Sequence, residues 1–99
     1  MQEDGKVKLE VKDAPPEKPK MNVKVYAPFN VYFEGEAYSI SAVNKTGPFD
    51  ILPRHRNFLC MLMPCDVVVH PVEGGKKVIK VYKALMHVKA DRVVVFVDV

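Results

Sequence analysis

Five side chains in this sequence are of the types that serve as nucleophiles, general bases or metal ligands: Cys60, Cys65, His55, His70 and His87. A cysteine paired with a histidine would give a small hydrolase, but the sequence shows no set of nucleophile, base and acid that would support this function. A zinc site needs more ligands than one C-x4-C pair supplies, and the histidines are scattered along the chain. We therefore predict no catalytic residue and no metal ligand.

The two cysteines flank Pro64, so a disulfide between adjacent strands is conceivable. The amino terminus, M-Q-E-D-G-K-V-K, is acidic where a secretory signal is basic and then apolar, so reduced thiols are the preferred interpretation. Gly74-Gly75-Lys76-Lys77 lacks the spacing of a phosphate-binding loop. No cofactor is predicted.

The composition is that of one globular domain. The chain has 99 residues, of which 48% are hydrophobic, and contains no tryptophan. It has no apolar run of the roughly 18 residues that a membrane-spanning helix needs, so we expect a soluble protein. The net charge of +3 is small and the basic residues are scattered along the sequence, which argues against nucleic-acid binding.

Residues 1–20 are expected to form an extension ahead of the domain at 21–99. Within it, residues 6–12 alternate between apolar and charged side chains, which favours an edge strand, with a flexible extension as the alternative. Residues 13–20 contain three prolines and are predicted to be a linker.

From Met21 onward, short β-rich segments alternate with turn residues. Strands are expected at 23–27, 31–34, 37–43, 58–63, 67–70, 78–82, 84–88 and 92–97, with another ending at 51–52. Gly35 is expected to turn the chain, and Gly74-Gly75 to form a hairpin turn. The run at 58–63 is apolar at every position, so we expect both of its faces to be covered. The predicted fold is all-β, a roughly ten-stranded flattened β-sandwich or barrel with an extra N-terminal strand.

Several of these segments follow, in order, a known family pattern. They are Val23 to Pro28, Val31 to Ala37, Ser39 to Ala42, Gly47 to His55, Leu59 to Pro64 and Arg92 to Val95. Together they resemble the N-terminal β-sandwich domain of the epsilon subunit of rotary F-type ATP synthases, called delta in mitochondria. The resemblance covers residues 22–98 and does not include the family's C-terminal helical hairpin.

The resemblance implies a non-catalytic subunit of the central stalk, or rotor, in a proton-translocating ATP synthase. In that role the domain couples the gamma subunit to the c-ring. The chain would lie in the cytoplasm, peripheral to the inner (plasma) membrane, and would associate with the membrane only through the complex.

By the same resemblance, two groups of residues are the candidate partner contacts. The group expected to face the c-ring comprises Pro48, Phe49, Asp50, Arg54, His55 and Arg56. The group expected to face gamma comprises Cys60, Met61 and Met63, with ordinary core packing between the sheets as the rival interpretation of this run.

Two departures from the family pattern affect the first group. Arg54 stands where the family usually has glycine, so a positive φ there would cost free energy. Pro48 replaces an acidic residue, and Asp50, two positions along the same strand, is the candidate to carry the missing negative charge. The rival interpretation of Asp50 is an exposed turn residue.

The alternative to a synthase subunit is a stand-alone β-sandwich protein-interaction module that kept the fold. The absence of the helical hairpin from the resemblance and the extra residues 1–20 favour this alternative. Binding to gamma distinguishes the two functions.

Overall fold

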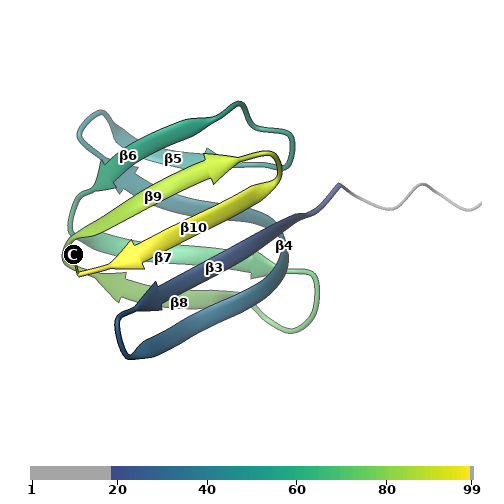
Figure 1. Cartoon of the computed structure of the whole chain (residues 1–99), viewed down its shortest axis with the longest axis horizontal. Coiled ribbons are helices and arrows are strands. Elements are labelled where there is room, and N and C mark those ends of the chain that lie inside the picture. Colours follow the sequence, from purple (N-terminus) through teal and green to yellow (C-terminus); the bar gives the residue numbers. More distant parts are fainter. Residues whose placement is uncertain (1–18, 99) are drawn as a thin grey trace, which may run out of the picture.

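The computed structural model describes residues 19–98, which form eight β-strands and no helix. The strands, with the labels of Figure 1, are β3 (Met21–Ala27), β4 (Asn30–Asn44), β5 (Gly47–Ile51), β6 (Phe58–Leu62), β7 (Cys65–Pro71), β8 (Lys77–Val81), β9 (Ala84–Lys89) and β10 (Arg92–Val97). The all-β prediction is confirmed. The predicted strand at 6–12 and most of the linker at 13–20 lie outside the described residues.

The strands form a single curled sheet, a half-barrel, with the order β6-β9-β10-β3-β4-β7-β8. The remaining strand, β5, pairs with β4 away from this path. Neighbouring strands are antiparallel except for β10 and β3, which pair in parallel. In Figure 1, β6, β9, β10 and β3 form the near layer, while β5, β7 and β8 lie behind them.

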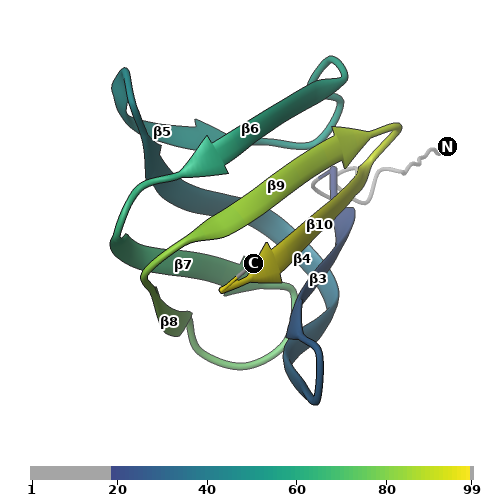
Figure 2. The same ribbon diagram turned by 60° about the vertical axis from the view of Figure 1, so that its left-hand side comes forward.

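The long strand β4 runs from its pairing with β3 to its pairing with β5 and so joins the two layers (Figure 2). The sequence prediction of two separate strands, at 31–34 and 37–43, was wrong. Gly35 does not turn the chain; it pairs with Val23 inside a continuous strand of 15 residues. The first half of β4 pairs with β3, and the second half pairs with both β5 and β7. Each half therefore has partners in a different layer, which makes one strand out of the two that local turn signals indicated.

The core fills the space inside the curl. Its buried side chains come from alternate positions of each strand, as a period of two requires. On β10, for example, Val93, Val95 and Val97 are buried, while Val94 and Phe96 point to the other side. β-Branched valine suits such a pleated surface, which explains why this valine-rich sequence forms strands.

The short turns between strands form where the sequence has glycine or asparagine. Gly74, with φ of 88°, lies in the predicted turn between β7 and β8. Asn44 accepts hydrogen bonds from the Thr46 N–H at 2.9 Å and from the Thr46 hydroxyl at 2.6 Å, which closes the turn before β5. Among residues 19–98, no helix has the length and apolar character needed to cross a membrane.

Candidate partner-binding surfaces

The residues predicted to face a c-ring lie on β5 and on the corner 52–57, which joins β5 to β6. Along β5, Pro48 and Asp50 are exposed on one side, as the period of two predicted. Phe49 points to the other side, packs against the core and contacts the Phe58 ring edge-on at 5.8 Å between centroids. Of the three β5 residues, Pro48 and Asp50 are thus the pair available on the surface.

The Asp50 carboxylate has a partner on the neighbouring strand. Its Oδ1 accepts a hydrogen bond of 2.6 Å from the hydroxyl of Ser41, which is its cross-strand partner on β4. This contact fixes the carboxylate on the exposed side of a paired strand. Asp50 is therefore part of a strand, whereas the rival interpretation required it to lie in a turn.

The corner is tight and is held by the backbone. The His55 N–H donates to the Leu52 carbonyl at 3.2 Å. Arg54 has φ of 68°, so the left-handed conformation that would favour glycine is present with arginine in its place. The Arg54 N–H donates to Oδ1 of Asp91, in the turn between β9 and β10, at 2.6 Å.

His55 is bonded locally, as its position at a corner predicted. Its Nδ1 lies 2.7 Å from the Arg56 carbonyl oxygen, and its ring meets Phe58 edge-on at 5.6 Å. Arg54 and Arg56 are both exposed on either side of it. The corner therefore presents two guanidinium groups around an imidazole that rests on the core.

The residues predicted to contact gamma lie on and just after β6, where the described residues cover only one of the two apolar faces. Leu59, Met61 and Met63 are 63%, 44% and 43% exposed, whereas Leu62 is buried. Cys60 is half-buried and packs against the core on the same side as Phe58 and Leu62. The exposure of Leu59, Met61 and Met63 shows that no other part of residues 19–98 covers the outer side of β6.

Met61 and Met63 share this outer side with Leu59, a residue that the sequence prediction did not include. Cys60, which the prediction did include, faces the core instead. The sequence contained the information needed to include Leu59, because residues 59, 61 and 63 are two apart and so face the same side of a strand. It was overlooked because the run is apolar at every position, and such a run does not show which face points inward.

The apolar surface of β6 continues across the near layer. Successive register partners join Met61 to Leu85, Phe96, Tyr26 and Val31, across β9, β10, β3 and β4. We call these five residues the outer band. Within it, the Tyr26 and Phe96 rings stack with centroids 5.0 Å apart.

The next rows of the same face become polar towards the corner. One row away from the outer band, Leu59 is followed across the sheet by His87, Val94, Lys24 and Glu34. The Lys24 ammonium lies 4.9 Å from the centre of the Tyr26 ring, at the border between the two rows. In the following row, Lys89, Arg92, Asn22 and Glu36 are all exposed.

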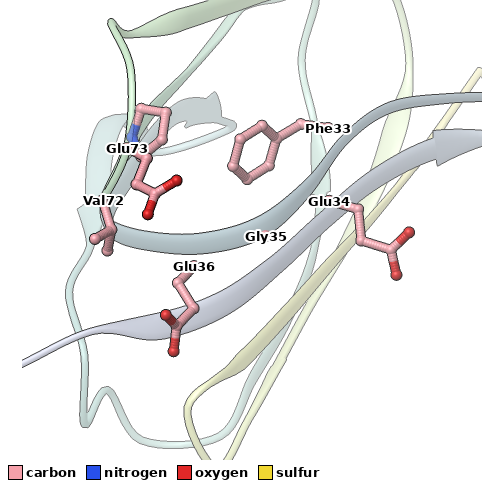
Figure 3. A pocket seen from close by; sticks show the side chains of 7 residues that line it. Phe33, Glu34, Gly35, Glu36, Val72 and Glu73 are labelled. Carbon is pink, nitrogen blue, oxygen red and sulfur yellow. The ribbon is translucent and has the colours of Figure 1, made fainter.

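The other features of the described residues do not form a reaction centre. A hollow of about 330 Å³ is lined by Phe33 and three glutamates, but Glu34 points away from Glu36 and Glu73 (Figure 3). No group of three histidine, cysteine or acidic side chains within residues 19–98 is placed to hold a metal ion. The hollow therefore gives no metal site.

The two cysteines are free thiols, which agrees with the interpretation from the sequence. Burial raises the pKa of the Cys60 thiol above its usual value, and a hydrogen bond with the Asn44 side chain opposes this rise in part. A nucleophilic cysteine needs a lowered pKa, so the environment of Cys60 argues against the hydrolase hypothesis.

Comparison with known proteins gives one family. Residues 20–99 match the family model described as ATP synthase, Delta/Epsilon chain, beta-sandwich domain. The ATP synthase epsilon chain of Clostridium novyi is 29% identical over 76 residues, which is 77% of this chain and 58% of that one. The epsilon chain of an Exiguobacterium species is 32% identical over 81 residues, covering 79% of this chain and 57% of its own length. The chain thus spans less than two thirds of these relatives.

A solved structure shares the fold. The match is to a chain in the cryo-EM structure of the Tetrahymena thermophila mitochondrial ATP synthase central stalk and c-ring, with a TM-score of 0.64 and 20% identity. It covers 83% of this chain and 66% of the other.

Proposed function

The chain belongs to the ATP synthase delta/epsilon β-sandwich family, and from this premise we propose that it is a non-catalytic subunit of the central stalk. In this role it couples the gamma subunit of a proton-translocating ATP synthase to the c-ring. It reaches the inner (plasma) membrane from the cytoplasmic side, as a peripheral part of the complex. The observation that carries the proposal is an exposed apolar sheet face on a domain of this family.

The gamma subunit covers the outer side of β6 and the outer band. Leu59, Met61 and Met63 are apolar and substantially exposed. Met61 also belongs to the outer band, so the two surfaces are continuous. Contiguous exposed apolar side chains of this kind mark protein interfaces. Their backbone is fixed by hydrogen bonds between strands, so binding orders few additional groups.

The c-ring meets the second surface, formed by β5 and the corner 52–57. Pro48 and Asp50 contribute the exposed side of β5, while Arg54, His55 and Arg56 contribute the basic corner. Phe49 supports this surface from the inside through its contact with Phe58. The Asp50 carboxylate pairs with a basic side chain of a c-ring loop, as the negative charge that Pro48 lacks.

The gamma contact is tested by placing a charge in the apolar surface. Met61→Lys in the full chain is expected to weaken binding to the gamma subunit at least tenfold, because an ammonium group in a desolvated contact is costly. The matched control is Val78→Lys on β8, which changes a side chain that is also exposed, at 53%, but lies in the other layer. Binding is measured by titrating labelled gamma with each variant after circular dichroism has shown the same fold.

Two outcomes would contradict this assignment. If Met61→Lys and Val78→Lys weaken binding equally, the outer side of β6 is not the contact. If the unsubstituted chain does not bind gamma at all, the proposed function fails and the stand-alone interaction module replaces it.

The c-ring contact is tested at Asp50. Asp50→Ala is expected to weaken binding to a reconstituted c-ring about five- to tenfold, with a smaller loss at high salt because the pair is exposed. The control is Asp66→Ala on β7, which removes an exposed carboxylate that lies 3.6 Å from the Lys80 ammonium. Unchanged binding of the Asp50 variant counts against the pairing.

A further inference from the structure

Asp91 connects three segments at one end of the domain. It lies in the turn between β9 and β10, and its carboxylate accepts the Arg54 N–H from the corner at 2.6 Å. Its backbone carbonyl accepts the N–H of Asn22, near the start of β3, at 2.9 Å. The corner, this turn and the beginning of β3 lie together at one end of the sheet (Figure 1).

The corner needs such an anchor because its backbone conformation is unfavourable. Arg54 has φ of 68°, and a side chain with a Cβ destabilises that conformation. The hydrogen bond inside the corner, from His55 to Leu52, is long at 3.2 Å. A hydrogen bond to a carboxylate is stronger than one to a carbonyl, so the bond to Asp91 stabilises the left-handed residue directly.

We propose that Asp91 is a positioning residue that fixes the basic corner relative to the sheet carrying the outer band. The inference rests on the proposed function, in which these two surfaces bind different partners. β10 and β3 supply Phe96 and Tyr26 to the outer band, and Asp91 joins both strands to Arg54. Rotation of one partner is thereby transmitted to the other with little local movement of the corner.

The rival explanation is that packing alone holds the corner. His55 rests on Phe58, and Phe58 contacts Phe49, so aromatic packing contributes to the same segment. The test must therefore report on Arg54 itself. Asp98 provides a matched control, because it is an exposed aspartate with φ of 58°, close to the 59° of Asp91, at the end of β10.

The experiment measures amide hydrogen exchange by NMR in the full chain. In Asp91→Ala, exchange of the Arg54 amide is expected to become at least tenfold faster than in the unsubstituted chain. Asp98→Ala should leave it unchanged, although it removes an aspartate from a similar backbone conformation. Asp91→Asn keeps an acceptor oxygen and should retain most of the protection.

The same variants are then tested for binding. Asp91→Ala is expected to weaken c-ring binding at least threefold while leaving gamma binding unchanged, and Asp91→Asn should restore c-ring binding. Unchanged exchange at Arg54 in Asp91→Ala overturns the inference whatever the binding results. Should the alanine variant not fold, Asp91→Gly compared with Asp98→Gly decides, because glycine adopts both positive φ values and exchange at Arg54 must be faster in the first.

The inference and the proposed function fail in different ways. If the unsubstituted chain does not bind the c-ring, the proposed function fails, but the exchange result at Arg54 still tests the role of Asp91. Normal c-ring binding by Asp91→Ala, together with faster exchange, shows that the anchor exists but does not position the contact, and this also overturns the proposal.

Discussion

The outer side of β6 and the corner that precedes it are neighbours in sequence, but different interactions hold them in place. β6 takes its position from the regular hydrogen bonds of its register with β9, so its exposed residues follow from a period of two. The corner has no such register. Its conformation depends on individual contacts, from Arg54 to Asp91 and from His55 to Phe58.

The difference shows where substitutions are tolerated. On β6, changes to the outward side chains are expected to have little effect on folding, because the backbone pairing remains. In the corner, the backbone conformation itself is costly, and one side chain located 37 residues away stabilises it. The β6 surface thus depends on regular pairing between strands, whereas the corner depends on a single distant side chain.

The largest expected effect contrasts the two sides of β6. Leu62→Ala removes a buried side chain, 3% exposed, and should lower the free energy of unfolding by about 2–5 kcal/mol. Leu59→Ala makes the same chemical change at 63% exposure and should alter it by no more than about 0.5 kcal/mol. Urea denaturation followed by circular dichroism measures both values, and similar losses would show that the outer side of β6 is packed.

An intermediate effect is expected in the corner. Arg54→Gly should raise the free energy of unfolding by about 1 kcal/mol, because glycine adopts a φ of 68° without a steric penalty. The control, Arg56→Gly, makes the same change two residues away, where the backbone has no positive φ. It should lower stability by about 0.5–1 kcal/mol through the entropy of the unfolded chain. Equal changes in the two variants would mean that the corner stores no strain at Arg54.

The smallest effect concerns the inward side of β6 at Cys60. In Cys65→Ser, which leaves Cys60 as the single thiol, alkylation at neutral pH should be slower than that of a cysteine peptide. Burial raises the pKa of Cys60, so less thiolate is present, and the rate should increase only at a pH above that needed by the peptide. Stopped-flow measurement across pH checks this. Faster reaction than the peptide at neutral pH would restore the hypothesis of a reactive cysteine.

Much of the fold was predictable from residue types. Alternating valines and the glycines of the β7–β8 turn fixed the strand character of residues 65–97, since side-chain alternation and positive φ are local properties. Gly35 misled the prediction for the same reason. As a local signal it indicates a turn, but in the structure it is a paired residue of a long strand, because β4 finds partners in both layers.

The candidate surfaces divide in the same way. The sequence by itself determined that Pro48 and Asp50 share one side of β5 and that a positive φ at Arg54 would be costly. Only the tertiary structure showed which parity of the all-apolar β6 points outward, which separates Leu59, Met61 and Met63 from Cys60. It alone brought Asp91 to the Arg54 amide, because that contact depends on how distant strands assemble and not on any local pattern.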